Sequence, residues 1–435
     1  MNIKRQFARY VSQNILGMIG ISLYILADSY FISIAEGASG LTALNLVLPL
    51  YNLIFAIGSM IGVGAAIRYT IAKAKDASDA DMYLSNAVFF AIVIGIIFAV
   101  IGLVFSDNLI MLLGADETIL QTGRVYTKIF MSFAPIFMLN YIANAFVRND
   151  GAPTLAMVAT LSSSIFNIIF DYVLMFPLNL GMAGAALATA LSPVVGIGIC
   201  LTHLLSKKCK IKFKICIPSI KRLFFSCQVG ISAFVGEISS GVITLVFNFL
   251  ILSIAGNVGV AAYGIIANIS LVTVSVFNGI ALGSQPLISK SYGQGNKNDV
   301  KLLKKMAFVV SAVASVVLYL SLFFGATQIV NIFNSEQNQM LGTYAEIGVK
   351  LYFLGIFFAG FNIVGSSFFS ATENTKGAFW VSILRGFVLI ILFAFVLSFF
   401  FGMNGVWLAY MAGELGTFVV MLYFLLKKRN NRVNA

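Results

Sequence analysis

The run NAVFFAIVIGIIFAVIGLVF, residues 86–105, has twenty consecutive positions without a charged side chain. About 20 apolar residues in a helix cross the hydrocarbon core of a bilayer, so this run predicts a transmembrane helix. The rest of the chain is similar, because 60% of its 435 residues are hydrophobic and 10% are charged, against about 25% charged in soluble domains. The composition excludes a water-soluble globular protein.

Comparable apolar runs recur along the whole chain, separated by Gly, Pro, Asn or charged residues. Lys4, Arg5 and Arg9 precede the first run, which is long and has no obvious cleavage site of small residues, so we expect a retained helix and not a signal peptide. We predict an all-α integral membrane protein with twelve transmembrane helices. These begin near residues 13, 44, 84, 125, 154, 182, 226, 260, 306, 347, 378 and 405.

Positive charge is distributed unevenly between the predicted loops. If the N-terminus is cytoplasmic, 25 of the 28 Lys and Arg residues lie in cytoplasmic segments, and only Arg124, Lys128 and Lys350 lie elsewhere. Cytoplasmic loops collect Lys and Arg, so we expect a multi-pass protein of the cell inner (cytoplasmic) membrane with both termini in the cytoplasm. The net charge of +12 then reflects topology and not nucleic-acid binding. Membrane lipids are the expected partners of the basic linker at 207–222.

Separate regions of the chain match each other at a nearly constant spacing. Gly40-Leu-Thr-Ala-Leu matches Gly259-Val-Ala-Ala-Tyr, and Gly184-Ala-Ala-Leu-Ala matches Gly405-Val-Trp-Leu-Ala at almost the same offset along the chain. This repeat predicts two pseudo-symmetric six-helix bundles around a central cleft, and we expect a monomer. The predicted domains are an N-terminal six-helix lobe, a basic cytoplasmic linker and a C-terminal six-helix lobe, at residues 1–206, 207–222 and 223–435.

Four acidic side chains lie well inside the predicted spans, at Asp28, Asp171, Glu237 and Glu414. An intramembrane carboxylate costs several kcal/mol unless it is paired, protonated or facing water, so each suggests a function. The first half holds the two Asp residues, whereas Glu237 and Glu414 are isolated in the second half. We therefore expect a coupling-ion site in the N-terminal lobe, with Glu237 and Glu414 as secondary candidates for binding an ion or a substrate.

Other polar side chains can add oxygen ligands to this site. Asn167 lies four residues before Asp171, so both project from one helix face, while Asn144 and Thr189 lie on the fourth and sixth predicted spans. Such oxygens suit a small hard cation such as Na⁺, and buried carboxylates can equally carry a proton. Each Asn or Thr taken singly has the simpler interpretation of a hydrogen bond between helices. We predict no other metal and no cofactor.

Three residue types receive simpler interpretations. Arg385 lies roughly eight residues inside its span and either extends its charge to the membrane surface or neutralises an acid. His203, the single histidine, borders the basic linker and is expected to be incidental. The four Cys residues contain no CxxC pair, which indicates neither a zinc site nor a disulfide framework.

The chain resembles the multidrug and toxic compound extrusion (MATE) family, in its DinF-like and MepA-like branch. The resemblance covers the whole chain and is carried by Asp28, Arg148-Asn-Asp-Gly-Ala-Pro, Asn167-Ile-Ile-Phe-Asp171, Gly283-Ser-Gln-Pro-Leu-Ile-Ser and Tyr292-Gly-Gln-Gly. It implies a cation site in the N-terminal lobe at the matching positions, Asp28, Asn144, Asn167, Asp171 and Thr189, and an ion or substrate role for Glu237. The first span lacks the proline of some relatives, so a proline-driven kink is not expected.

The main functional hypothesis is a secondary active multidrug efflux antiporter. It would export amphipathic or cationic organic compounds, its small-molecule substrates, in exchange for H⁺ or Na⁺. A flippase for lipid-linked oligosaccharides is one alternative, but its cleft needs positive charge for pyrophosphate, and the deep charges here are mainly acidic. An intramembrane enzyme is an alternative of a different class, against which the sequence lacks HExxH, an acid-rich metal loop and a Ser/His pair.

Overall fold

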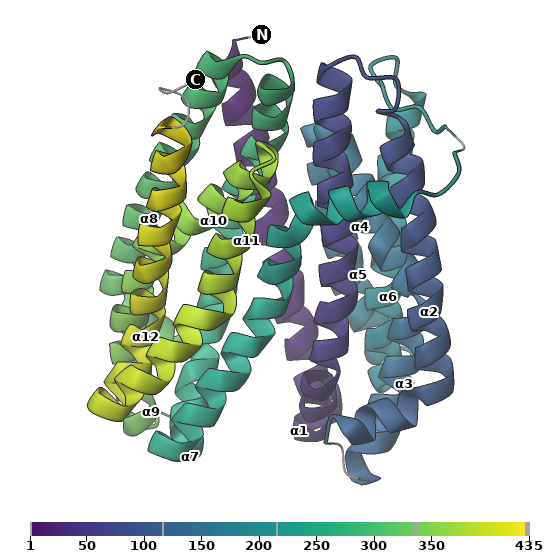
Figure 1. Cartoon of the computed structure of the whole chain (residues 1–435). Coiled ribbons are helices and arrows are strands. Elements are labelled where there is room, and N and C mark those ends of the chain that lie inside the picture. The colour runs from purple at the N-terminus through teal and green to yellow at the C-terminus, as the bar shows by residue number, and fades with distance from the viewer. Residues whose placement is uncertain (1, 115–116, 215, 335–336, 431–435) are drawn as a thin grey trace.

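The computed structural model describes residues 2–114, 117–214, 216–334 and 337–430. Within these residues the regular secondary structure is entirely helical. The helices form two bundles side by side, and the start of α1 and the end of α12 lie at the same end of the molecule, which we call the terminal end (Figure 1).

The N-terminal bundle contains six helices, and the helix ends follow from local sequence. Asp150 to Ala152 separate two of these helices, and Pro153 starts the second, where its missing N–H costs no hydrogen bond. The helices are α1 (Ile3–Ala74), α2 (Met82–Leu112), α3 (Glu117–Ser132), α4 (Ala134–Asn149), α5 (Pro153–Met175) and α6 (Gly181–Leu201), followed by a short 3₁₀ turn, η1 (Thr202–Leu205).

The C-terminal bundle follows the linker, and side-chain caps begin several of its helices. Asn296 accepts a hydrogen bond from the Asp299 backbone N–H at 3.1 Å, and Asn374 accepts one from Gly377 at 3.2 Å. Its elements are α7 (Ile220–Gly293), α8 (Lys297–Phe333), α9 (Gln339–Tyr352), η2 (Phe353–Gly355), α10 (Ile356–Ala371), α11 (Thr375–Ile383), η3 (Leu384–Val388) and α12 (Leu389–Asn430).

Left-handed backbone turns recur at the same spacing as the sequence repeat. Gly37 (φ 64°, ψ −150°) interrupts α1, and Gly256 (φ 62°, ψ −158°) interrupts α7 at the matching position of the second half. Gly181 and Gly402 form a second matching pair, with φ of 51° and 55°. Glycine adopts these angles without a Cβ clash. Two further pairs follow the repeat, Asp76 with Gly295 and Gly151 with Glu373. The two halves therefore share one backbone plan.

Nine helices of the described residues are long and apolar enough to cross a membrane, or ten if α3 and α4, which are bent by 48°, form one span. Two of them, α7 with 74 residues and the segment Thr375–Lys427 with 53, far exceed the roughly 20 residues of one crossing. Gly256 and Gly402 interrupt these two segments. The structure confirms an all-helical chain with many apolar helices, while the count of twelve spans stays a prediction.

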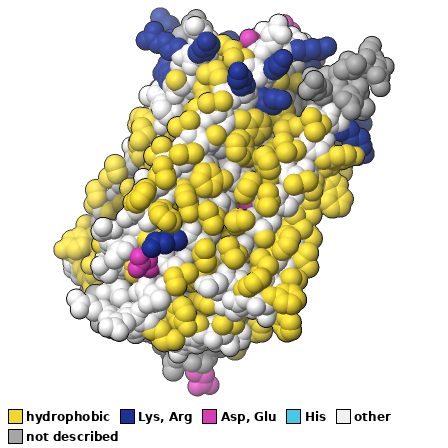
Figure 2. All heavy atoms as spheres, turned by 90° about the vertical axis from the view of Figure 1, so that its left-hand side faces the viewer, with side chains coloured by type: hydrophobic (Ala, Val, Ile, Leu, Met, Phe, Trp, Pro, Cys, Tyr) yellow, Lys and Arg dark blue, Asp and Glu magenta, His cyan; other side chains and the backbone are white. Residues whose placement is uncertain are grey.

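Each bundle has its own hydrophobic core. One core consists of buried residues between positions 32 and 190, and the other of residues between 247 and 421 together with Phe7 and Val11. Lys and Arg gather at the terminal end, and hydrophobic side chains cover most of the face below it (Figure 2). A surface of this kind is suited to lipid. The domain boundaries given above remain predictions.

The bundles meet near the terminal end, mainly through α1 and α7. A Cβ at Gly64 would contact the backbone of Ser226, and one at Gly230 would contact the backbone of Met60. Gly283 packs in the same way on Val11. At the opposite end a Cβ on Gly37 or Gly256 would have no atom of another described segment within 4 Å. Small residues thus allow close packing at one end of the interface.

Polar contacts join the bundles in the same region. Arg68 forms an ion pair with Glu373, and the Gln285 amide donates to Asn149 at 3.2 Å. Deeper in the interface, the Ser22 hydroxyl donates to Ser275 at 2.6 Å. The described contacts therefore close the space between the bundles at the terminal end.

Candidate cation site in the N-terminal bundle

The two predicted acids of the N-terminal bundle lie close together in its interior. Asp28 is on α1 and is 9% exposed, while Asp171 is on α5 and is fully buried. The two carboxyl groups lie near enough to interact electrostatically. Asp28 Oδ1 and both carboxyl oxygens of Asp171 have no hydrogen-bond donor among the described residues. Two acids on helices far apart in sequence thus form one site.

Asn167 and Thr189 belong to the same site. The Asn167 amide donates to the Thr189 hydroxyl at 3.3 Å, which joins α5 to α6. This bond confirms the simpler interpretation of a contact between helices. However, Asn167 Oδ1 is buried and lacks a donor in the described part of the chain, and it lies one helical turn from Asp171. Asn167 therefore also adds an oxygen acceptor to the acid pair.

Two tyrosines near the site were not foreseen. Tyr126 on α3 lies beside Thr189, and both Tyr126 and Tyr24 on α1 lie near Asp28 and Asp171. The Tyr24 and Tyr51 hydroxyls are 3.4 Å apart. Among 16 Tyr and 40 Phe, no sequence signal separates these rings from aromatic residues that only pack.

Asn144 lies in a different polar cluster. Its amide donates to the Thr160 hydroxyl at 2.8 Å, and its carbonyl accepts from Arg148 at 3.4 Å. Arg148 also donates to Asn14 at 3.4 Å. None of these hydrogen bonds reaches Asp28 or Asp171. The structure therefore brings together four of the five predicted residues and places the fifth nearer the terminal end of α4.

The site consists of buried oxygen acceptors. Four oxygens of Asp28, Asn167 and Asp171 lack a donor within the described ranges, and buried polar groups without partners are rare and costly. Carboxylate and amide oxygens are ligands for hard cations, and a proton on a carboxyl group would also supply the missing donor. The residues present therefore suit Na⁺ or H⁺.

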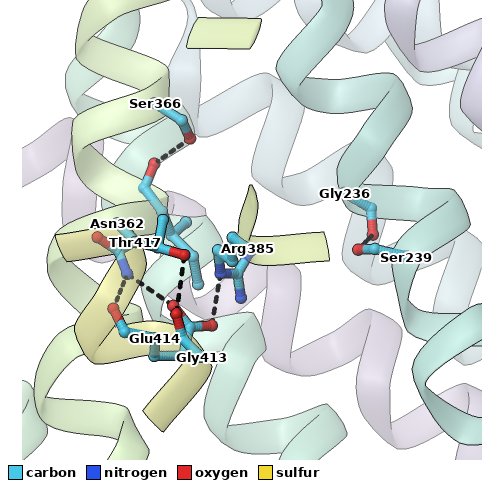
Figure 3. Close-up of polar contacts among 9 residues, drawn as sticks. Gly236, Ser239, Asn362, Ser366, Arg385, Gly413, Glu414 and Thr417 are labelled. Carbon is cyan, nitrogen blue, oxygen red and sulfur yellow. Dashed lines mark hydrogen bonds and ion pairs between the residues drawn. The ribbon is translucent and has the colours of Figure 1, made fainter. Parts of the chain in front are cut away.

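The two secondary candidates have unlike surroundings. Glu237 on α7 is partly buried and accepts from the Tyr141 hydroxyl of α4 at 3.5 Å, so it lies where the bundles meet. Glu414 on α12 was expected to be isolated, and this was wrong. Its Oε1 accepts from Arg385 Nε at 2.7 Å and its Oε2 from Asn362 Nδ2 at 2.7 Å (Figure 3). Arg385 therefore neutralises an acid.

His203 was expected to be incidental, and this too was wrong. Its Nε2 is 2.8 Å from Asp150 Oδ2, which also accepts from the Lys210 backbone N–H at 2.8 Å. The Tyr69 hydroxyl donates to Asp150 Oδ1 at 3.0 Å. Cys209 completes a group of possible metal-ligand atoms within 4.8 Å of one another. Because Asp150 already has three partners, on α1, at His203 and on the linker backbone, the cluster is explained as a clamp that holds the linker against α1 and the α4–α5 turn.

These features define a many-helix membrane protein with an acidic site inside one of two repeated bundles. The family model MatE matches residues 14–173 and 233–396. The chain belongs to this family, the MATE transporters, whose members are not enzymes.

The chain is similar to curated and solved members over nearly its full length. The multidrug export protein MepA of Staphylococcus aureus strain MRSA252 is 29% identical over 419 residues, covering 95% of this chain and 92% of MepA. MepA of Staphylococcus saprophyticus is 28% identical over 422 residues, with the same coverage. An outward-facing multidrug resistance MATE transporter of the MOP superfamily has a TM-score of 0.93 at 21% identity, covering 100% of this chain and 98% of that one.

A MOP superfamily transporter from Pyrococcus furiosus has a TM-score of 0.89 at 22% identity, covering 98% of this chain and 95% of that one. It is described as having a binding pocket of reverse polarity. At these identities the solved structures establish the fold only. We therefore judge whether the site in this chain is acidic or basic from its own residues and not from those structures.

Proposed function

We propose that this protein is a cation-coupled antiporter that exports amphipathic or cationic organic compounds in exchange for H⁺ or Na⁺. In this proposal it is a monomer of the cytoplasmic membrane, with both termini inside and lobes at 1–206 and 223–435. The name of the MepA relatives, multidrug export protein, supports the direction of transport and the substrate class.

One observation carries the coupling: Asp28 and Asp171 share a buried site in which three of their carboxyl oxygens lack a donor among the residues described. A carboxylate in such surroundings is stable only with a proton, a cation or water beside it. Membership of the family explains the two bundles but not which ion fills this site. Asn167 and Thr189 complete the proposed site, and Asn144 is assigned to it by its place in the sequence and by the family resemblance.

The closed interface at the terminal end suggests how the site is used. If that end is cytoplasmic, its closure leaves the outside as the direction from which a cation would enter, and in this proposal an external cation competes with a cationic substrate at Asp28 and Asp171. The ion must bind the two conformations with unequal affinity to drive the change between them. Opening of the terminal end then requires the Arg68–Glu373 pair to separate.

The test is transport of ethidium in proteoliposomes with Na⁺ and pH gradients imposed separately. Wild-type protein is expected to respond to one of the two gradients, which identifies the ion. Asp28→Asn and Asp171→Asn should each abolish the response. Asp76→Asn is the matched control, because Asp76 is exposed and its φ of 52° is also accessible to Asn. Normal gradient-driven transport by both Asn variants would refute the proposal.

The flippase alternative requires a cationic surface for pyrophosphate. The N-terminal bundle instead presents acidic and amide oxygens that lack a donor among the described residues, which would repel a pyrophosphate. Inhibition of dye transport by a lipid-linked pyrophosphate, but not by an organic cation, would favour it.

A further inference from the structure

A cavity of about 350 Å³ lies where the two bundles meet near the terminal end. Met60 on α1 forms its wall on the side of the N-terminal bundle, and the start of α7 and the start of α11 form the other walls. The start of α7 lies across α1 here before the helix turns along the C-terminal bundle (Figure 1). The cavity therefore needs both bundles to be complete.

The walls from α7 and α11 are mainly apolar. Phe224, Cys227 and Ile231 follow an i, i+3, i+7 spacing, so one face of α7 lines the cavity. Phe379 and Trp380 line it from α11. Phe224, Phe379 and Trp380 are also well exposed to the surroundings of the protein, and exposed aromatic rings are typical of the membrane–water interface. A hydrophobic chain can therefore enter the cavity from the surrounding lipid.

Positive side chains lie at the rim of this cavity. Lys376 lines it directly, and Lys221 precedes Phe224 by three residues, so it lies on the same face of α7. Both lysines are exposed, and neither forms an ion pair with a described residue. The neighbouring acid, Glu373, is already paired with Arg68. The rim is therefore suited to a negatively charged group.

An anionic phospholipid matches both properties of this cavity. Its acyl chain suits the apolar walls, and its phosphate suits the lysines, because basic pockets between transmembrane helices bind anionic headgroups. Helix α11 also begins at this rim, with Thr375 as its first residue, and a helix N-terminus favours a phosphate. A water-soluble anion would leave the apolar walls uncovered, and a neutral lipid would leave both lysines unpaired.

We propose that this cavity binds one anionic phospholipid of the leaflet at the terminal end, and that the lipid holds the bundles together there. The acyl chain contacts Met60 of the N-terminal bundle together with Phe224 and Trp380 of the C-terminal bundle. Separation of the bundles at this end would dismantle the site, so the lipid binds the closed form better and stabilises it. This inference does not depend on which ion or compound the protein transports.

The two tryptophans of the chain make a direct test possible. Trp380 lines the cavity and is 49% exposed, whereas Trp407 is fully buried. In a Trp407→Phe protein the remaining tryptophan fluorescence comes from Trp380, and lipids with brominated acyl chains quench it on contact. The full-length protein is reconstituted in phosphatidylcholine with a small fraction of brominated phosphatidylglycerol, or with the same fraction of brominated phosphatidylcholine. We expect stronger quenching by the phosphatidylglycerol.

Substitutions at the rim and in the wall separate a cavity site from general attraction to charge. Lys376→Gln should lower the preference for phosphatidylglycerol about fivefold, because one basic residue near anionic lipid contributes about 1 kcal/mol. Lys221→Gln together with Lys376→Gln should lower it further. Cys227→Phe fills the cavity, keeps both lysines and should also lower it. Lys301→Gln is the matched control, because Lys301 is exposed on α8, none of whose residues lines the cavity.

Two further measurements use the protein with both tryptophans in place. Native mass spectrometry of wild type should find one phosphatidylglycerol retained, and fewer in the double lysine variant. Labelling of an engineered interface cysteine at the terminal end should be slower with phosphatidylglycerol in the bilayer than without it, and this difference should disappear in the double lysine variant.

The proposal is overturned by equal quenching from the two brominated lipids, or by a preference that the double lysine variant retains. A preference unchanged in folded Cys227→Phe would show attraction to the lysines without a cavity site and would overturn it as well. Retention of no phosphatidylglycerol by wild type would do the same. Labelling that is independent of phosphatidylglycerol would overturn the role of the lipid in holding the bundles together.

Discussion

The two bundles treat their buried acids in opposite ways. In the N-terminal bundle, three carboxyl oxygens of Asp28 and Asp171 lack a donor in the part of the chain that the structure describes. In the C-terminal bundle, both oxygens of Glu414 are bonded, to Arg385 and Asn362 at 2.7 Å each. Acids that look alike in the sequence thus divide into two carboxyl groups without a donor among the described residues, at which we propose a cation binds, and an acid that Arg385 already neutralises. The difference between them is the position of one arginine.

The largest expected effect is on folding stability in the C-terminal bundle. Glu414→Gln leaves the Arg385 charge without its partner and should lower the free energy of unfolding by about 3 kcal/mol. Replacing both residues, as Arg385→Met with Glu414→Leu, should recover most of that loss. Thermal unfolding in detergent measures both variants. A Glu414→Gln protein as stable as wild type would show that the ion pair contributes little.

The next effect is on transport through the N-terminal bundle. Asp171→Asn should reduce gradient-driven efflux by up to about 100-fold, because a coupling energy of about 1–3 kcal/mol is lost. The same change removes a buried carboxyl group whose oxygens have no donor among the described residues, so stability should not fall. Efflux assays and unfolding curves on one preparation give both values. Loss of stability without loss of transport would contradict the assignment of Asp171 to transport and would give it a structural role instead.

A third effect concerns the interface that joins the bundles. Gly230→Ala would push a methyl group onto the Met60 backbone, and overpacking of this kind costs about 1–3 kcal/mol. The terminal end should open, which labelling of an engineered interface cysteine can detect. Gly236→Ala is the control, because a Cβ there would have no atom of another described segment within 4 Å. Equal labelling of the two variants would contradict the prediction.

The smallest effect is expected at the partly exposed pair between Arg68 and Glu373. Glu373→Gln should weaken closure of the terminal end by no more than about 1 kcal/mol, because solvent screens such pairs. The same labelling assay in low and high salt measures it. Wild-type labelling should rise with salt, whereas that of the variant should respond less. Labelling that is independent of both salt and the substitution would exclude a role in closure.

Much of the fold was predictable because membrane helices have a strong one-dimensional signal. The apolar runs and the nearly constant offset between matching segments predicted helices in repeated halves, and the positive-φ residues of the structure recur at the same offset. The repeat could not predict the chemistry of each half. Matching positions of the two halves have the same backbone conformation, but the repeat does not restrict which side chain stands at each of them.

The candidate site was predictable only in part. A charged residue inside an apolar run is visible in sequence, as are residues one helical turn apart, so Asp28, Asn167 and Asp171 were identified. Asn144 follows the same pattern, yet its hydrogen bonds go to Thr160 and Arg148. The direction in which a helix faces its neighbours is not encoded by spacing alone.

The sequence alone determined that the chain lies in a membrane, that it is built from two repeats, and that a few carboxyl groups inside apolar spans carry a large desolvation cost. These properties follow from local composition, because the hydrophobic effect acts on each segment. Only the tertiary structure decided which acid has a partner, because Glu414 and Arg385 are 29 residues apart and meet through the packing of η3 on α12. It also brought Asp28 and Asp171 together from α1 and α5, which makes two costly residues one site.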